Sequence, residues 1–377
     1  MNTPKIRFKG FKDDWEQRKL GELVDVCSGR DYKHLSEGTI PVYGTGGYML
    51  SVNDALSYDR DAIGIGRKGT IDRPYILKAP FWTVDTLFYA IPREKVDLNY
   101  AFDIFQNIDW KKKDESTGVP SLSKTAINDI DVLAPKHDEQ QIIGQFFAAI
   151  DNLITLHQRK CDETKQLKKF MLQKMFPKNG EKNPEIRFEG FTDDWEQRKL
   201  GELGEIMTGS TPSTSKPEYY SENGIPWVTP TDIDALTISD TPRKLSEEGI
   251  KVGRVVPANT ILCTCIASIG KNALLMVKGS FNQQINSLTP SAENDSYFLL
   301  TESELWSEKM KRMAASGTMQ IVNKTEFSEL VTMVPSLDEQ KIIGFYFRNI
   351  DNLITLHQRK CEKIKELKKF MLQNMFV

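Results

Sequence analysis

The sequence predicts a mixed α/β (α+β) fold in which two globular domains are separated by two long helices that form an antiparallel coiled coil. Three observations lead to this prediction. A helical pattern at 138–176 returns at 338–376, and the block IDNLITLHQRKC is the same in both copies. A shorter segment at 5–23 returns at 185–203. The stretches between these repeats differ, so the chain has a pseudo-twofold internal repeat around two unlike inserts.

The repeated pattern has the features of a long helix. A proline precedes each copy, and two acidic residues occupy its first turn, where the helix dipole favours negative charge. Apolar residues recur at steps of three and four, which is typical of a narrow coiled-coil seam. Polar residues fill the other faces, so each helix needs a partner, and the other copy is the obvious one. The predicted seam consists of Ile143, Ile150, Leu153, His157, Leu167, Met171, Ile343, Ile350, Leu353, His357, Ile364, Leu367 and Met371.

The middle of the predicted seam is polar, with His157 in one copy and His357 in the other. In an antiparallel pair related by a pseudo-twofold axis, the two rings would meet near the crossing point. A metal site and a device that fixes the register of the helices both fit this pair. The chain has only four histidines and no further ligand spacing around these two, so we expect the register device and no metal.

The two inserts, at about 24–135 and 204–335, share almost no sequence. Both contain apolar runs typical of strands, such as FWTVDTLFYAI at 81–91, and segments of helical spacing. We therefore expect two mixed α/β domains held in a nearly identical frame. The predicted divisions are 1–136 for the first repeat segment and domain, 137–177 for the first helix, 178–336 for the linker, second repeat segment and second domain, and 337–377 for the second helix.

The frame is repeated even at positions that should face solvent, such as Gln158 and Arg159. A duplicated surface suggests that each half docks the same partner, two copies in all. Unlike inserts in an identical frame suggest two heads that read two different targets.

Composition narrows the class of protein. The 377 residues carry a formal net charge of −2, which argues against coating nucleic acid by bulk charge but leaves room for local basic patches. Five cysteines, an odd count without paired spacing, suggest a reducing cytoplasm. No apolar run approaches a membrane span and no signal-peptide pattern opens the chain, so we expect a cytoplasmic protein without a membrane partner.

The sequence contains no recognisable active site. Gly64-Ile-Gly66-Arg-Lys-Gly69 matches the dinucleotide fingerprint, but no helix pattern follows it, and we expect a hairpin turn there. Methyltransferase, nuclease, helicase and hydrolase motifs are absent from the sequence, as are clusters of metal ligands. We therefore predict no catalytic residue and no cofactor bound by this chain.

Polar loop residues in both inserts suit DNA. Arginine and lysine reach guanine edges or phosphates, and glutamine suits adenine. The candidate DNA-binding residues are Lys33, Arg67, Lys68, Thr70, Arg73, Lys111, Lys112 and Lys113 in the first insert, and Lys216, Thr229, Thr231, Arg243, Lys271, Gln283, Gln284 and Gln320 in the second.

Four motifs and their order along the chain resemble those of a known family. The segment DDWEQRKLGEL occurs twice, GSTPSTSKPEYYSENGIPWVTPTDI opens the second insert, FWTVDTLFYAI lies in the first, and both helices begin with DEQ-x-IIG. In this order, the motifs closely resemble the DNA specificity subunits of type I restriction-modification systems. The first insert departs from the pattern because it lacks the GSTP…PWV opening.

The resemblance implies a non-catalytic specificity subunit with two target recognition domains. Each domain would read one half of a split, asymmetric site in double-stranded DNA, and the paired helices would set the spacing between the halves. Two modification subunits would carry S-adenosylmethionine and methylate adenine. Two restriction subunits would carry ATP and Mg for translocation and cleavage.

Two other hypotheses remain open on the sequence alone. One is a nucleotide-dependent enzyme built on the Gly-rich loops, for which the isolated chain would bind a nucleotide. The other is a coiled-coil scaffold whose inserts bind proteins, for which arginine and lysine changes in the inserts would leave DNA affinity unchanged.

Overall fold

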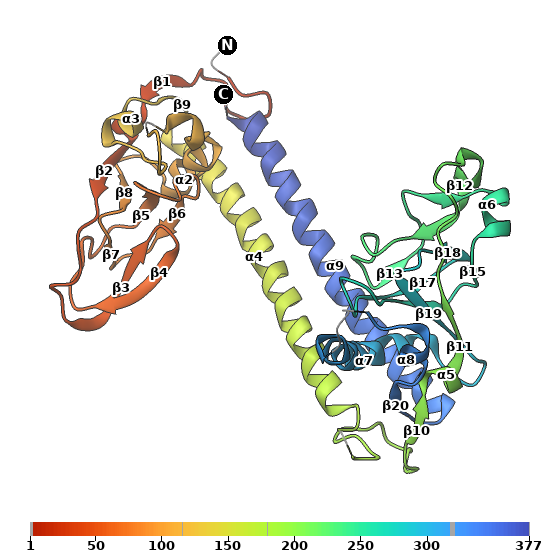
Figure 1. Ribbon diagram of the computed structural model, residues 1–377. Helices are drawn as coiled ribbons and strands as arrows, with labels where there is room; N and C mark the ends of the chain where they lie inside the picture. The colour runs from red at the N-terminus through yellow and green to blue at the C-terminus, as the bar shows by residue number, and fades with distance from the viewer. Residues whose placement is uncertain (1–2, 115, 179, 317–320, 377) are drawn as a thin grey trace. The chain divides into compact units, whose positions relative to one another are not determined.

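The computed structural model describes residues 3–114, 116–178, 180–316 and 321–376 (Figure 1). The chain forms two compact units. Unit 1 comprises Met1–Arg159 with His357–Val377, and unit 2 comprises Lys160–Leu356. The two long helices, α4 (His137–Lys174) and α9 (Leu337–Met375), each begin in one unit and end in the other. Among the described residues, no helix is long and apolar enough to cross a membrane.

The described residues of unit 1 form three small sheets, with strand orders β1-β9, β2-β8-β5-β6 and β4-β3-β7. The strand β3 pairs antiparallel with β4 and parallel with β7. The strands of unit 1 are β1 (Glu16–Lys19), β2 (Val24–Ser28), β3 (Glu37–Gly44), β4 (Gly47–Val52), β5 (Ala62–Gly66), β6 (Tyr75–Leu77), β7 (Trp82–Thr83), β8 (Leu87–Pro92) and β9 (Asp131–Ala134). Its short helices are α1 (Leu20–Leu23), α2 (Leu98–Asn107), η1 (Trp110–Lys113) and α3 (Lys124–Asn128).

Unit 2 has the corresponding sheets, with orders β10-β20, β11-β19-β16-β17-β13 and β14-β12-β18-β15. Its strands are β10 (Glu196–Lys199), β11 (Gly204–Thr208), β12 (Tyr220–Val228), β13 (Thr237–Ile238), β14 (Lys244–Leu245), β15 (Val255–Val256), β16 (Thr260–Thr264), β17 (Asn272–Leu275), β18 (Gly279–Phe281), β19 (Ile285–Pro290) and β20 (Val331–Val334). Its short helices are α5 (Leu200–Leu203), η2 (Pro217–Tyr219), α6 (Glu247–Val252), α7 (Ser296–Ser316) and α8 (Lys324–Ser328).

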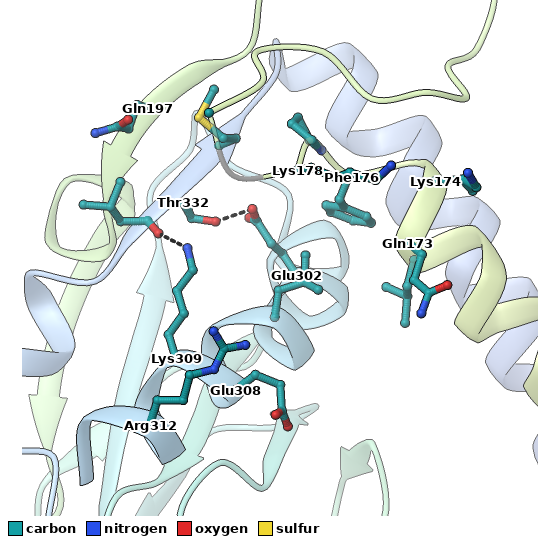
Figure 2. A pocket seen from close by; sticks show the side chains of 16 residues that line it. Gln173, Lys174, Phe176, Lys178, Gln197, Glu302, Glu308, Lys309, Arg312 and Thr332 are labelled. Atoms are coloured by element: carbon teal, nitrogen blue, oxygen red, sulfur yellow. Dashed lines mark hydrogen bonds between the residues drawn. The ribbon is translucent and has the colours of Figure 1, made fainter. Parts of the chain in front are cut away.

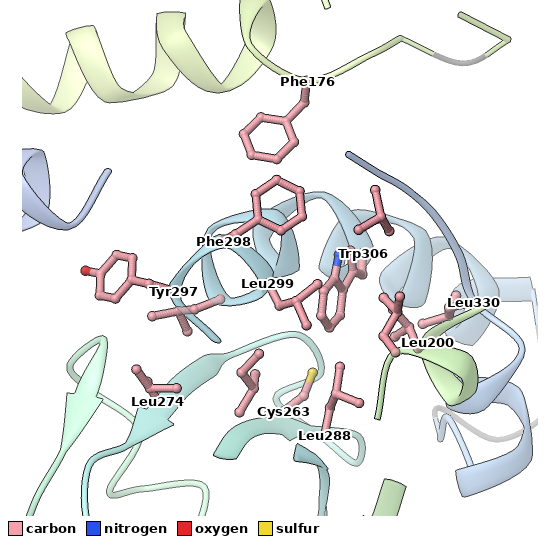
Figure 3. Close-up of a cluster of buried hydrophobic side chains, with 14 of the residues drawn as sticks. Phe176, Leu200, Cys263, Leu274, Leu288, Tyr297, Phe298, Leu299, Trp306 and Leu330 are labelled. Atoms are coloured by element: carbon pink, nitrogen blue, oxygen red, sulfur yellow. The ribbon is translucent and has the colours of Figure 1, made fainter. Parts of the chain in front are cut away.

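The core of unit 2 lies between α7 and the five-stranded sheet. Figure 3 shows Phe298, Leu299 and Trp306 of α7 above Cys263 and Leu288 of the strands, all of them buried. Burying large apolar side chains of this kind supplies most of the favourable free energy of folding.

The long helices pack antiparallel within each unit. In unit 1 the rings of Phe147, near the start of α4, and Phe376, just after the end of α9, lie 6.0 Å apart. In unit 2 Phe347 of α9 and Phe176 just after α4 make the same contact at 5.9 Å. The mixed fold, the antiparallel helix pair and the internal repeat predicted from the sequence are thereby confirmed.

The seam follows a strict three-four alternation. Its buried or half-buried positions are 143, 147, 150, 154, 157, 161, 164, 168 and 171 in α4 and 175 just after it, and the same positions plus 200 in α9. Of the predicted seam residues, Ile143, Ile150, His157, Met171, Ile343, Ile350, His357, Ile364 and Met371 lie on this face.

The assignment of Leu153, Leu167, Leu353 and Leu367 to the seam was wrong. Each of these leucines is between 46% and 49% exposed. The seam is formed instead by the neighbouring residues, Ile154, Cys161 and Lys168 in α4 and their repeats in α9. The prediction places a step of three residues where the seam takes a step of four. Both steps fit a heptad locally, but the difference of one residue moves the predicted position by about 100° around the helix.

Candidate nucleic-acid interface

In unit 1, loops that are distant in sequence meet at one edge of the β2-β8-β5-β6 sheet. The strands β2 and β5 both end beside the start of β8, with which they pair antiparallel. The last residue of β7 and the three residues that connect it to β8, together 83–86, lie between these strand ends; we call them strap 1. In strap 1, Thr83 O accepts a backbone hydrogen bond from Arg30 N (2.8 Å), and Thr86 O accepts one from Arg67 N (2.8 Å). Val84 N of the strap donates one to Tyr43 O (3.0 Å).

In unit 2 the same skeleton occurs with other residues. The last residue of β18 and the three residues that connect it to β19, together 281–284, form strap 2. In strap 2, Phe281 O accepts a backbone hydrogen bond from Ser210 N (2.9 Å), and Gln284 O accepts one from Cys265 N (2.8 Å). Asn282 N of the strap donates a hydrogen bond to Val228 O (2.9 Å). The following bonds also match, since Leu122 N donates to Arg67 O (2.9 Å) in unit 1 and Val322 N donates to Cys265 O (3.0 Å) in unit 2. The two inserts therefore build the same loop edge from unlike sequences.

One glycine in each unit makes this skeleton possible. A Cβ on Gly29 would lie 1.9 Å from Val84 O, and a Cβ on Gly209 would lie 2.1 Å from Asn282 O. No other residue lets the strap approach so closely. This pair, 180 residues apart, is a sequence signal that could have helped to align the two inserts.

The turn after β5 presents cations beside strap 1. Gly64 and Gly66 belong to the buried strand β5, and the exposed residues Arg67 and Lys68 follow it. The Arg67 guanidinium lies 5.7 Å from the centre of the Phe88 ring, and its Nη1 donates to Asp85 O at 3.4 Å. No helix opens after Gly69, so the dinucleotide match is a turn between strands, as we expected from the sequence.

The corresponding edge of unit 2 presents hydroxyl, carboxamide and carboxylate groups. Thr229 Oγ1 and Thr231 Oγ1 are 2.8 Å apart, and Thr229 Oγ1 donates to Asp232 at 2.6 Å. Thr211 Oγ1 donates to the side-chain carbonyl of Gln283, and Asn282 Nδ2 donates to Gln284 Oε1 at 3.1 Å. Four of the predicted residues of the second insert, Thr229, Thr231, Gln283 and Gln284, thus lie in or beside strap 2.

Other predicted residues lie away from the straps or are engaged by neighbours. Lys111 pairs with Asp72 at 2.9 Å, which places η1 beside the turn that carries Thr70 and Arg73. Lys112 pairs with Asp109 at 3.2 Å, and Lys113 ends η1. Lys33 is exposed in the loop before β3.

In unit 2 the remaining candidates are dispersed. Lys216 lies over the Tyr219 ring at 5.2 Å, and Arg243 lines a separate cavity of about 420 Å³. Lys271 closes the loop after β16, where its carbonyl accepts from Thr264 N at 2.9 Å. Gln320 lies outside the described residues.

Each unit also exposes an apolar row along its helices. The row of unit 1 consists of Leu153 and Leu156 of α4 with Leu367 and Phe370 of α9. The row of unit 2 consists of the equivalent residues, Leu353, Leu356, Leu167 and Phe170. Every member lies one position before a seam residue, so the row flanks the seam, and exposed apolar stripes of this kind mark interaction sites. Sequence reasoning missed these rows because it assigned half of their members to the seam.

Within the ranges that the structure describes, the polar centre of the seam brings together no group of three side chains that could ligate a metal ion. The Nδ1 atoms of His157 and His357 lie 3.0 Å apart, so one ring donates its N–H to the other. Further along the seam, Lys368 Nζ contacts Asp151 at 2.6 Å and Gln106 at 2.6 Å. Charged pairs inside a seam fix register at a cost in stability.

Figure 2 shows a cavity of about 870 Å³ in unit 2 between the end of α4, the strand β20 and α7. Lys309 and Arg312 line it beside Glu302, which is fully buried and accepts a hydrogen bond from Thr332 Oγ1. Burial raises the pKa of the Glu302 carboxyl to about 8, so this side chain is mostly protonated at neutral pH. The cavity adjoins the helix frame rather than strap 2, and we assign no DNA contact to it.

The chain matches the model of the type I restriction modification DNA specificity domain twice, at residues 12–166 and 192–366. It is 23% identical to the MjaVIII specificity subunit of Methanocaldococcus jannaschii, a match that covers 95% of this chain and 91% of that protein. It is 28% identical to the MjaIX specificity subunit of the same organism and 27% identical to the HindI specificity subunit of Haemophilus influenzae. These two matches span 44% and 39% of the relatives' lengths, less than half of each.

A solved structure of the S subunit of a type I restriction-modification system from M. genitalium has the same fold. Its TM-score is 0.76 at 13% identity, with 100% of this chain and 99% of that chain covered. A chain from a structure of a type I restriction-modification complex matches with a TM-score of 0.52 and 15% identity, over 95% and 96% of the two chains. The two copies of the domain model together cover most of the sequence, so this chain belongs to the family of type I restriction-modification DNA specificity subunits.

Proposed function

We propose that this chain reads a bipartite, asymmetric DNA site, with unit 1 on one half and unit 2 on the other. One observation carries the proposal: the same backbone skeleton holds two straps whose surroundings expose different side chains. A shared skeleton supports two heads that approach DNA in the same way. Different side chains at its edge support two different half-sites, because base-edge contacts carry the sequence information.

The chemistry of the two edges favours different bases. Arg67 and Lys68 beside strap 1 suit guanine edges or phosphates, and Gln283 and Gln284 in strap 2 suit adenine. Thr229 and Thr231 add hydroxyl groups that pair with either bases or phosphates. The paired helices α4 and α9 then set the number of base pairs that are left unread between the two halves.

The exposed rows support two copies of one partner. Each unit carries one row with the same four residue types, Leu, Leu, Leu and Phe, on the same positions of the helix pair. Identical surfaces bind identical partners. We propose that each row docks one modification subunit, which carries S-adenosylmethionine and methylates adenine.

The remaining chemistry also belongs to partners. Two restriction subunits would supply ATP, Mg and DNA cleavage, while this chain binds no cofactor and performs no reaction itself. In the part of the chain that the structure describes, no cluster of three metal-ligating side chains is present, and the Gly64–Gly69 match is not a phosphate-binding loop.

The reading role is tested by mapping methylated adenines in source cells with and without this gene. A split motif that disappears on deletion is the expected result, and it supplies both half-sites and their spacing. An unchanged map would contradict the proposal once co-purification had shown that a methyltransferase subunit is bound to the chain.

The docking role is tested by breaking one row at a time. Replacing Leu153 and Phe370 by aspartate puts two charges into the row of unit 1 and leaves the row of unit 2 intact. Native mass spectrometry of the purified complex should then show one modification subunit instead of two. Thr155→Asp, an exposed change on the same helix outside the row, is the matched control. Two bound copies in the double variant would refute the assignment.

A further inference from the structure

The third residue of each strap, Asp85 in strap 1 and Gln283 in strap 2, occupies a special position. The residue before it donates its backbone N–H to a neighbouring strand end, Val84 to Tyr43 and Asn282 to Val228. The carbonyl of the residue after it accepts a hydrogen bond from the turn that follows β5 or β16. The backbone is therefore fixed on both sides, whereas the third side chain itself is exposed.

A fixed backbone with an exposed polar side chain is the geometry that precise recognition requires. Recognition groups on rigid supports hold their positions better than groups on free loops. The same position on the same skeleton carries a carboxylate in one unit and a carboxamide in the other. These two groups offer different hydrogen-bonding patterns, since a carboxylate only accepts and a carboxamide both donates and accepts.

The carboxylate of Asp85 has no hydrogen-bond or ion-pair partner among the residues that the structure describes, although Arg67 lies beside it and donates to its backbone carbonyl. Phosphates would repel this carboxylate, so its favourable partner on DNA is an amino group at a base edge. In the major groove the N4 amino group of cytosine is the donor that acidic side chains accept from.

The side chain of Gln283 is already oriented by the protein. Thr211 Oγ1 donates to its Oε1, which leaves the Nε2 amino group and one lone pair of Oε1 for an outside partner. That combination of one donor and one acceptor matches N7 and N6 of adenine.

We propose that the third strap residue determines specificity in both units, Asp85 by accepting a hydrogen bond from cytosine in one half-site and Gln283 by pairing with adenine in the other. This inference rests on the proposed reading function and names the residues that carry it. Gln283 is predicted from the sequence by its residue type, whereas Asp85 is not, because an acidic side chain is a poor candidate for DNA binding until its place in the fold is known.

The test uses the full chain in complex with its modification subunits and S-adenosylmethionine. A DNA library with randomised half-sites is methylated and sequenced, and base preferences are compared between variants. Asp85→Asn should weaken the preference for cytosine at one base pair of one half-site by about tenfold, and Gln283→Glu should do the same for adenine in the other half-site. Asp85→Gln should create a preference for adenine at the affected position.

Asp59→Asn is the matched control. Asp59 is an exposed acid of unit 1 in the loop before β5, next to Arg60, whose guanidinium donates to Pro92 O at the far end of β8 from strap 1. Its map should equal that of the unaltered chain.

Unchanged base preferences in all strap variants would overturn the inference and leave the proposed function standing. Loss of preference throughout both half-sites would also overturn it, because it would mean that the strap supports structure and reads no particular base. An unaltered complex that methylates the library without any preference would instead refute the proposed function itself.

Discussion

Replacing Glu302 by glutamine should remove a pH-dependent weakness from unit 2. The carboxyl of Glu302 is fully buried in α7, and its Oε2 atom has no hydrogen-bond partner in the described part of the chain. The equivalent place in unit 1 is apolar, since α2 carries Ile104 there and β9 carries Val132 where β20 carries Thr332. The repeat therefore supplies its own apolar reference for this polar pair.

The sign and size of the effect follow from the pKa of Glu302. Burial raises this pKa from its ordinary value of 4.5 to about 8. Between these two values the folded chain holds a proton that the unfolded chain has lost, so stability falls as the pH rises from 4.5 through about 8. The whole interval corresponds to about 5 kcal/mol as an upper bound. Relaxation of the carboxylate toward the adjoining cavity lowers this figure, and we expect about 2–4 kcal/mol.

The assay is urea denaturation at several values between pH 5 and pH 9, followed by tryptophan fluorescence, to which Trp195, Trp227 and Trp306 of unit 2 contribute. Glu302→Gln should match the unaltered chain near pH 5 and exceed it increasingly toward pH 9. Glu308→Gln, an exposed change on the same helix, should show no such divergence. If the unaltered chain and Glu302→Gln lose stability in parallel across this range, the buried carboxyl is not the source of the pH dependence, and the reasoning is refuted.

Three further predictions concern the frame and the edge of unit 1. Lys368→Ala should lower the free energy of unfolding by about 1–3 kcal/mol because it leaves Asp151 unpaired, and Lys368→Met, which leaves Asp151 equally unpaired, should cost nearly as much, as measured by chemical denaturation. Ile154→Ala should lower it by about 1–3 kcal/mol while Leu153→Ala stays within about 0.5 kcal/mol, which separates the seam from the docking row. Gly66→Ala, whose Cβ would lie 2.0 Å from Thr70 O, should distort the turn that presents Arg67 and weaken binding to one half-site in a DNA affinity assay.

The seam shows which features of the helix pair can be predicted from the periodicity of apolar residues alone. Repeats, direction and length of the helices were all predictable, because the pattern of three and four residues is written twice in the sequence. Which of Leu167 and Lys168 lies in the seam could not be predicted in this way. Leucine is the more apolar residue and is usually the more buried one, whereas here the lysine is buried. Lys168 is buried because Asp351 and Glu304 lie 2.9 Å and 2.6 Å from its Nζ. Those contacts come from distant segments that periodicity does not represent.

Only some residues of the candidate DNA edge could be predicted from the sequence, because residue type does not show where a side chain lies in the fold. Selecting residues by type identified Arg67, Lys68, Gln283 and Gln284, which the structure gathers beside the straps. The same selection also chose Lys112 and Lys216, which have partners elsewhere. Side-chain type says what a residue is able to bind, but only the fold places it at an edge.

The shared skeleton explains how two unlike inserts serve one frame. The bonds that hold each strap run from backbone N–H to backbone carbonyl, so they constrain conformation and leave side-chain identity free, apart from Gly29 and Gly209, which admit no Cβ. Exposed positions such as Asp85 and Gln283 are then able to change without loss of the fold, since surface substitutions cost little stability. The helices carry the opposite constraint, because both copies must satisfy the same seam and the same docking row. Divergent inserts between nearly identical helices are the pattern that these two constraints produce together.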